Sequence, residues 1–183
     1  MPDAPAAEAL IGDMATGFDP VGNLQPTVLI LGSLPGVASI QEQQYFAHPR
    51  NQFWSIMARI AEFEVGSSYR HRVSCLAQRG IMLWDVVHSA YREGSLDSNI
   101  KSSGLEVNPF SDLLASNSIK LIAFNGAAAE KYFVKYAVPD VSLAGVDPSM
   151  LPELIKLPST SPANAGMSFE QKLSKWQILA NYI

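Results

Sequence analysis

The sequence predicts an α/β domain built on a mostly parallel sheet. Short, β-branched apolar runs recur along the chain, and segments with helical spacing separate them. Such runs are typical of parallel strands that are buried on both faces. Strands that alternate with helices define this fold class. The predicted strands lie at 27–32, 81–87, 120–126 and the start of 154–166.

The first two predicted helices follow the first strand. After Asn51, which is a suitable N-cap, apolar residues recur at helical spacing through Phe53, Ile56 and Ile60. The segment 67–80 predicts a second helix that ends at a glycine.

Further helices are predicted after the second and third strands and at the end of the sequence. Asn108 and Pro109 form a cap and first-turn pair. The segment 127–137 follows the third strand with a helical composition. Ser168 with Gln171 matches a capping box and predicts a final helix that reaches the last few residues.

Polar loops follow the ends of the predicted strands, at 33–50, 88–104, 125–126 and 158–166. Ligands of parallel sheets bind outside the carboxyl ends of the strands. We therefore expect these loops to converge on one site. Segment 88–104 is long for a loop in a compact domain, which is typical of functional or mobile loops.

Composition limits the class of protein. The 183 residues, 48% hydrophobic and 16% charged, suit one folded domain. No apolar run approaches the roughly 18 residues of a membrane span, so we expect no membrane partner. A single cysteine, Cys75, fits a reducing compartment, and we expect a cytoplasmic protein.

The first 24 residues contain four acidic residues and no lysine or arginine. They predict a flexible acidic leader rather than a signal peptide, followed by one domain over 25–183. Without them, the net charge of −4 becomes about zero, because 13 acidic residues face 13 basic ones. A neutral domain argues against a strongly basic, non-specific DNA binder but allows an enzyme that acts on DNA.

Several catalytic motifs are excluded. The stretch "GSLPG" at 32–36 matches neither a dinucleotide-binding nor a Walker-type phosphate loop, and alone it indicates a tight turn. Ser98 and Lys101 match the spacing of an acyl-enzyme pair, but the partner motifs of that family are missing. The histidines show no metal-ligand spacing with Cys75, so we expect no metal.

The loops are rich in amide, hydroxyl and aromatic groups. Asp85 at a strand end is a candidate general base, although such a residue more often anchors a loop. Asn125 alone indicates a turn, but beside the other loops it faces a cleft. Aromatic faces and amide groups suit recognition of a planar heterocycle. Phosphoryl transfer is disfavoured, because no carboxylate cluster is available for Mg²⁺.

Three stretches in chain order, "GSLPG", "FAHPRNQFW" and "LPSTSPANA", resemble the uracil-DNA glycosylase superfamily, and most closely its hypoxanthine-DNA glycosylase (deoxyinosine glycosylase) branch. The resemblance spans about residues 27–178. It implies a three-layer α/β/α sandwich around a short, mostly parallel four-stranded sheet. It also implies a monofunctional enzyme that flips a deaminated base out of DNA and hydrolyses its N-glycosidic bond in base excision repair.

Two departures bear on the substrate that the resemblance implies. Leu34 stands where mismatch-specific uracil glycosylases have a water-positioning asparagine, and Leu157 stands where several uracil branches have a histidine that supports the departing base. In the hypoxanthine branch the corresponding work falls to asparagines that match Asn51 and Asn125.

The resemblance implies a set of site residues. Phe46 stacks on the flipped base, Asn51 acts on the water or the developing charge, and Asn125 binds the base edge. The loop after the last strand contacts the DNA backbone. The full set is Asn51 and Asn125 as catalytic residues; Gly32, Ser33, Leu34, Pro35, Gly36, Tyr45, Phe46, His48 and Asp85 for the substrate; and Ser159, Thr160, Ser161, Pro162, Asn164 and Ala165 for DNA.

The expected partner is double- or single-stranded DNA with a deaminated base, bound by a monomer that associates with the nucleoid when it acts. No cofactor is expected, and no lysine lies at a Schiff-base position of these motifs, so lyase activity is not expected. Two alternatives stay open: a uracil or mismatch glycosylase of the same superfamily, and a non-catalytic domain that binds nucleobases or DNA.

Overall fold

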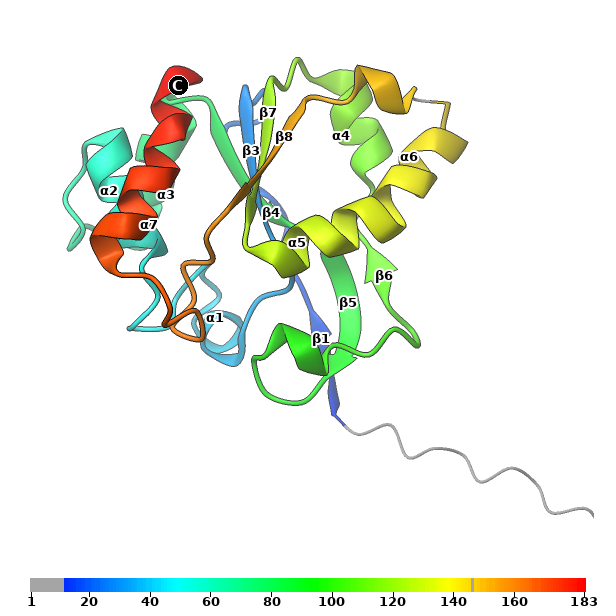
Figure 1. The fold of residues 1–183 in the computed structure, drawn as a ribbon, viewed down its shortest axis with the longest axis horizontal. Coiled ribbons are helices and arrows are strands. Elements are labelled where there is room, and N and C mark those ends of the chain that lie inside the picture. Colours follow the sequence, from blue (N-terminus) through cyan, green and yellow to red (C-terminus); the bar gives the residue numbers. More distant parts are fainter. Residues whose placement is uncertain (1–11, 146) are drawn as a thin grey trace, which may run out of the picture.

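A five-stranded sheet forms the centre of the protein (Figure 1). The computed structural model describes residues 12–145 and 147–183. Four strands are parallel, and the short edge strand β2 pairs antiparallel with β4. The order β2-β4-β3-β7-β8 is formed by Val21–Gly22, Ile81–Asp85, Val28–Gly32, Leu121–Asn125 and Glu153–Leu157. The predicted α/β sandwich is confirmed, with one antiparallel strand more than expected.

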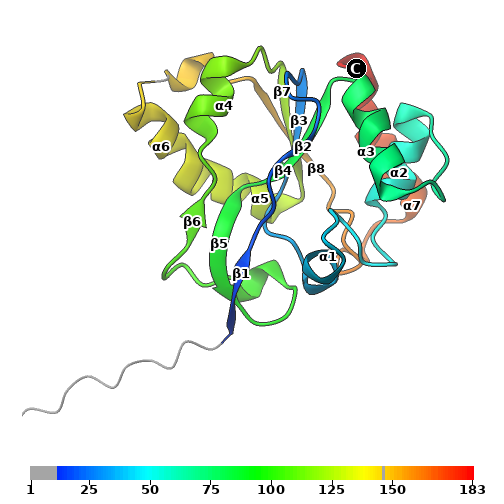
Figure 2. The ribbon, with the colours of Figure 1, turned by 180° about the vertical axis from the view of Figure 1, so that it is seen from behind.

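Helices cover both faces of this sheet (Figures 1 and 2). One face carries α2 (Phe53–Ala61), α3 (Tyr69–Gln78) and α7 (Phe169–Trp176). The other carries α4 (Phe110–Ser116), α5 (Ala127–Tyr132) and α6 (Val138–Leu143), with a π-helical turn between α5 and α6. A short helix α1 (Val37–Glu42) lies below the sheet, and 3-10 turns occur at Asp97–Asn99, Pro148–Met150 and Gln177–Asn181.

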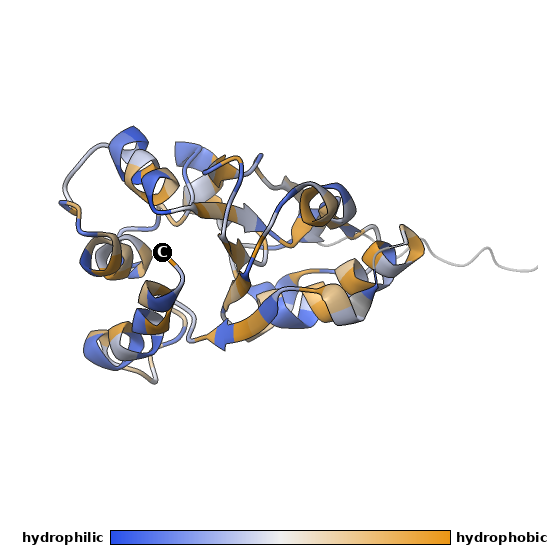
Figure 3. Cartoon of the chain, turned by 90° about the horizontal axis from the view of Figure 1, so that it is seen from above, coloured by the Kyte–Doolittle hydropathy of each residue, from blue (hydrophilic) through white to orange (hydrophobic). Residues whose placement is uncertain are grey.

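Alternate strand residues fill two apolar cores. In β3, Val28 and Ile30 pack on the α2, α3 and α7 side, whereas Leu29 and Leu31 pack on the α4 to α6 side. Figure 3 shows the hydrophobic colouring of the strands between the two helical layers. Because both faces of β3 are covered, its sequence is apolar throughout, which explains the continuous run. No helix within the two described ranges is long and apolar enough to cross a membrane.

A second, three-stranded antiparallel sheet was not predicted. It joins β1 (Asp13–Thr16), β5 (Val87–Arg92) and β6 (Glu106–Val107). The expectation of a loop over 88–104 is therefore wrong for residues 88–92, which extend the chain from β4 after one intervening residue.

The expected flexible leader also differs from the structure. Its residues 13–16 pair with β5, and its residues 21–22 pair with β4. Trp84 Nε1 donates a hydrogen bond to the carbonyl of Phe18 at 3.0 Å. The prediction that residues 12–24 are unanchored is thus wrong, because backbone pairing holds them. Residues 1–11 lie outside the described part.

The predicted caps have mixed outcomes. The Ser168 and Gln171 capping box is confirmed. Helix α2 begins at Phe53, and the Asn51 side chain accepts a hydrogen bond from the Phe53 N–H at 2.9 Å, although Gln52 occupies the cap position. Asn108 caps nothing; its buried side chain donates to the Asp85 carbonyl at 2.8 Å.

Gly126 joins β7 to α5 with a backbone φ of 101°. A Cβ at this position would lie 2.9 Å from Ser159 Cβ. We expect Gly126→Ala to lower the free energy of unfolding by about 1–3 kcal/mol, because alanine rarely adopts this conformation. Urea denaturation measures the change. Gly66→Ala, with open space around the new methyl group, serves as the control, and an equal loss in both variants would contradict this explanation.

Candidate active site

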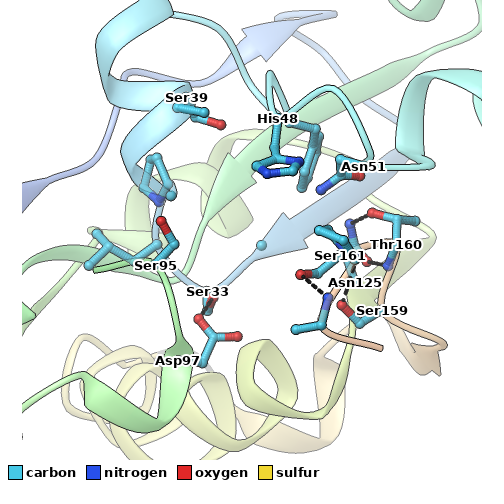
Figure 4. Close-up of a pocket in the computed structure, with 18 of the residues that line it drawn as sticks. Ser33, Ser39, His48, Asn51, Ser95, Asp97, Asn125, Ser159, Thr160 and Ser161 are labelled. Atoms are coloured by element: carbon cyan, nitrogen blue, oxygen red, sulfur yellow. Dashed lines mark hydrogen bonds between the residues drawn. The ribbon is translucent and has the colours of Figure 1, made fainter. Parts of the chain in front are cut away.

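A cavity of about 440 Å³ lies at the carboxyl ends of β3, β4 and β7, where the loops were expected to meet (Figure 4). Its volume suits a small organic ligand. The walls come from five segments of the chain and two single residues at strand ends, namely 32–36, 38–39, 45–51, 95–97 and 159–163 with Asp85 and Asn125.

Most of the predicted site residues meet at this cavity. The predicted residues in its walls are Gly32, Ser33, Leu34, Pro35, Gly36, Tyr45, Phe46, His48, Asn51, Asp85, Asn125, Ser159, Thr160, Ser161 and Pro162. Asn164 and Ala165 are outside them. Asn164 instead donates a hydrogen bond to the Ser159 carbonyl at 3.0 Å, within its own loop.

The two neighbouring aromatics differ in position. Tyr45 is only 2% exposed, and Trp54 Nε1 donates to its carbonyl at 2.8 Å, so it mainly supports the wall. Phe46 is half-buried and stacks on Phe53 with a centroid distance of 4.0 Å and an interplanar angle of 30°. Its φ of 56° is unusual for a bulky residue, and such strain clusters at functional sites. Phe46 is thus a fixed aromatic surface at the cavity.

Asn51 presents one half of its amide to the cavity. Its Oδ1 accepts from the Phe53 N–H, which identifies Nδ2 as the group left over. Figure 4 shows the Asn51 nitrogen on the cavity side, beside the His48 ring. His48 Nδ1 accepts from the Arg50 N–H at 3.1 Å, so its neutral ring carries the proton on Nε2. Both residues therefore offer N–H donors.

Asn125 and Thr160 bind each other. The Thr160 N–H donates to Asn125 Oδ1, and Asn125 Nδ2 donates to Thr160 Oγ1, both at 2.9 Å (Figure 4). Thr160 is fully buried. Its hydroxyl oxygen accepts from Asn125, so Thr160 holds this amide in place, and its predicted contact with DNA stays a prediction. One hydrogen of the Asn125 amide remains for a ligand.

The loop after β8 is held rigidly by α7. Trp176 Nε1 donates to the Pro158 carbonyl at 2.9 Å, and Lys172 Nζ donates to the Asn164 carbonyl at 2.8 Å. Within the loop, Ser159 Oγ accepts from the Ser161 N–H at 3.2 Å. Such local side-chain bonds fix a polar turn without regular structure.

The first glycine-rich loop is fixed from β5. The Leu34 side chain is buried in a small apolar cluster with Val87 and Ala90. The buried guanidinium of Arg92 donates to the carbonyls of Leu34 and Pro35. Arg92 thereby fixes the backbone of a loop whose residues 32–36 line the cavity.

Asp85 is the buried carboxyl of the cavity. Burial and, to a smaller extent, the charge of Asp97 raise its pKa and Arg92 lowers it, with a net pKa of about 8. Asp97 accepts a hydrogen bond from Ser33 Oγ at 2.5 Å, and burial raises the pKa of Asp97 as well, although the Ser33 bond and Arg92 oppose that rise. An uncharged Asp85 is therefore favoured near neutral pH.

Sequence reasoning missed several residues of the site. Asp97 and Ser95 line the cavity from the segment that was expected to be a loop, and Arg92 lies in the unexpected strand β5. Arg50 also lines the cavity, although only its neighbours in "FAHPRNQFW" were assigned roles. Asp97 lies in a polar segment beyond the end of β5, and nothing in the sequence around it signals that it approaches Ser33.

Fold and site together define an α/β domain with a cavity at the carboxyl ends of its parallel strands, where such folds bind their ligands. Residues 20–181 match the family described as the Uracil DNA glycosylase superfamily, and the chain belongs to that family. The resemblance found in the sequence is confirmed.

Two relatives are named Hypoxanthine DNA glycosylase. The protein of Methanosarcina barkeri is 42% identical over 119 residues, which is 63% of this chain and 73% of the relative. That of Methanosarcina acetivorans is 37% identical over 165 residues, 89% of this chain and 96% of the relative. A solution NMR structure of a candidate uracil DNA glycosylase from M. acetivorans matches with a TM-score of 0.73 and 34% identity, covering 92% of this chain and 97% of the other.

The raised pKa of Asp85 makes the stability of the protein depend on pH. In the unfolded chain the carboxyl has its ordinary pKa near 4. Below pH 4 the carboxyl is protonated in both states and does not lower the free energy of unfolding. As the pH rises toward 8, only the folded state keeps the proton, so the free energy of unfolding falls. We expect Asp85→Asn to be more stable than the wild type at pH 8 by on the order of 3 kcal/mol, with a smaller gain at pH 5.

Chemical denaturation of both proteins at several pH values between 5 and 8.5 measures this difference. If the stabilities of the wild type and the variant changed in parallel over that range, Asp85 would not be the group that makes the stability depend on pH. Asp140→Asn, at an exposed position of α6, is a suitable control for the loss of one carboxyl charge.

Proposed function

We propose that this protein is a monofunctional DNA glycosylase that removes hypoxanthine from deoxyinosine in DNA by hydrolysis. The observation that carries the proposal is the Asn51 amide, whose oxygen is held by α2 while its nitrogen faces the cavity beside the His48 ring, in a wall that also contains Phe46. The names of the two relatives, which match 63% and 89% of the chain, support hypoxanthine as the base.

The target nucleotide rotates out of the DNA into the cavity before the chemistry. Unstacking and unpairing require a few kcal/mol, and less for a mispaired base, which favours a deaminated base over a normal one. Phe46 stacks on the flipped base, and its own contact with Phe53 keeps the ring from moving away. Residues 32–36 line the cavity and form part of the base pocket.

Two amides act on the reacting groups. Asn51 donates a hydrogen bond from Nδ2 to the attacking water or to charge that develops in the transition state. A preorganised donor of this kind typically contributes about 10²–10³ in rate. Asn125 uses its remaining amide hydrogen on the base edge, and Thr160 fixes its orientation.

Several features support hypoxanthine and simple hydrolysis. Leu34 and Leu157 are 5% and 3% exposed, so neither position offers the polar group that uracil-excising branches use there. Among the residues of the described chain that line the cavity there is no lysine, which fits water rather than an amine as nucleophile.

DNA is the partner, and we propose that the protein binds it as a monomer in the cytoplasm, associated with the nucleoid while it acts. The rigid loop 159–163 and the exposed Arg50 form the rim of the cavity, where the phosphates next to the flipped nucleotide would lie.

We expect Asn51→Asp to lower the rate of hypoxanthine release by at least about 100-fold without loss of stability. Aspartate retains the oxygen that accepts from the Phe53 N–H but lacks the amide donor. Single-turnover excision from duplexes with one inosine or one uracil opposite each normal base measures the effect. Asn51→Ala should lose both activity and about 1 kcal/mol of stability.

Faster release of uracil than of hypoxanthine by the wild type would instead favour the uracil or mismatch glycosylase. Tight lesion binding without release of either base, even at high enzyme concentration, would favour a non-catalytic binding domain.

Arg50→Ala tests the position of the DNA backbone. We expect weaker binding to every duplex sequence and a smaller slope of log affinity against log salt, by about one unit, because one phosphate contact is lost. Fluorescence anisotropy at several salt concentrations measures both. Arg59→Ala, in the last turn of α2 and outside the cavity wall, should leave the slope unchanged. Equal slopes for all three proteins would exclude Arg50 from the interface.

A further inference from the structure

The carboxyl of Asp85 has no structural partner that explains its position. An aspartate at a strand end usually anchors a loop through backbone N–H groups. Here Oδ2 has no hydrogen-bond partner among the described residues, and it is the backbone carbonyl that accepts from Asn108. The residue is 2% exposed, and an unpaired buried polar atom is destabilising by about 1–3 kcal/mol. Such an atom is retained more readily where it serves a ligand.

The strand pairing and the neighbouring residues show that this carboxyl lies at the cavity. Asp85 pairs with Gly32 across β4 and β3, and its Oδ1 lies against the Gly32 Cα, in the space that a side chain would fill. Gly32, Phe46 and Asp85 line the same cavity, and the Phe46 ring also approaches Gly32. The Phe46 ring and the Asp85 carboxyl therefore both lie next to Gly32 in the wall of one cavity, which is where a base that stacks on Phe46 would bind.

The charges around Asp85 keep it protonated near neutral pH. Burial is the main cause of the raised pKa, Asp97 adds to it, and Arg92 opposes it. On the α2 and α3 side the titratable groups are Tyr45 and Tyr69, whose pKa values burial raises, so both stay neutral. A neutral carboxyl in a polar cavity is a proton donor, whereas the two asparagines can only donate hydrogen bonds.

We propose that Asp85 is the general acid that gives its proton to N7 of the purine as the base leaves. This inference rests on the proposed excision of hypoxanthine. The C1′–N9 bond breaks and its electron pair passes into the imidazole ring, while the Asp85 proton forms the N7–H bond. The water oxygen bonds to C1′, and the proton that this water loses returns to the Asp85 carboxylate. The products are neutral hypoxanthine and an abasic sugar.

This role explains a preference for purines. Without the proton, hypoxanthine would leave as an anion into a cavity that already holds two aspartates, Asp85 and Asp97. A pyrimidine has no ring nitrogen equivalent to N7, so the acid does not assist its departure. The same carboxyl then contributes both to the rate and to the choice of base.

The full-length Asp85→Asn variant tests the proposal, because asparagine keeps the size and a hydrogen-bond donor but cannot transfer a proton. Release of hypoxanthine is measured under single-turnover conditions with saturating enzyme from pH 5.5 to 9.5. We expect the wild-type rate to fall about tenfold per pH unit above pH 8. We expect the variant to be about 100-fold slower at pH 7 and to lack this fall.

Ionisation of the inosine base itself would lower both profiles equally, so the comparison isolates the enzyme. A variant within about threefold of the wild type at pH 7, or one with the same alkaline fall, would overturn the role of Asp85. A wild type that releases no hypoxanthine at any pH would refute the proposed function instead, whereas release with a flat profile would refute only this inference.

Asp97→Asn provides a second test that keeps Asp85 in place. Removing the Asp97 charge lowers the pKa of Asp85, so the alkaline fall should move to lower pH. A merely structural role of Asp85 predicts no such movement, and an unmoved fall would count against general acid catalysis even if Asp85→Asn failed to fold.

Discussion

The parallel pairing of β3 with β4 and β7 is the constraint on which the cavity depends. It sets Gly32 opposite Asp85 and Leu31 opposite Phe124, so that the three strands end at one level. A shift of one residue would turn each buried side chain toward the wrong core, and the register is therefore fixed by apolar packing. The two apolar cores therefore determine where the polar groups at the strand ends lie, although these groups are not part of either core.

Most of the central sheet and its helices could be predicted because their signals are local. Apolar runs mark the buried strands, and the Ser168 capping box marks α7. The second sheet could not be predicted in this way. Strand β5 mixes buried and exposed polar residues, and β1 is held by backbone pairing with a partner more than 70 residues away. Nothing in either segment alone distinguishes a strand from a loop.

The residues of the candidate site also fall into those with a local sequence signal and those without one. Asn51 and Phe46 could be identified because they stand in one compact motif, and their neighbours in sequence hold them in place. The bond between Asn125 and Thr160 spans 35 positions, and the approach of Asp97 to Ser33 spans 64. Contacts of this range are products of the whole fold. They decide that Thr160 fixes the Asn125 amide and that Asp85 lies near a second carboxyl.

The attachment of the 158–164 loop to α7 couples the cavity wall to one short helix. Lys172 and Trp176 hold the two ends of this loop through single hydrogen bonds to its carbonyls. A helix of eight residues packed along one face can open while the central sheet stays intact. Heat inactivation of the enzyme would then precede global melting, and the temperature at which α7 loosens, rather than that at which the sheet unfolds, would limit its working range.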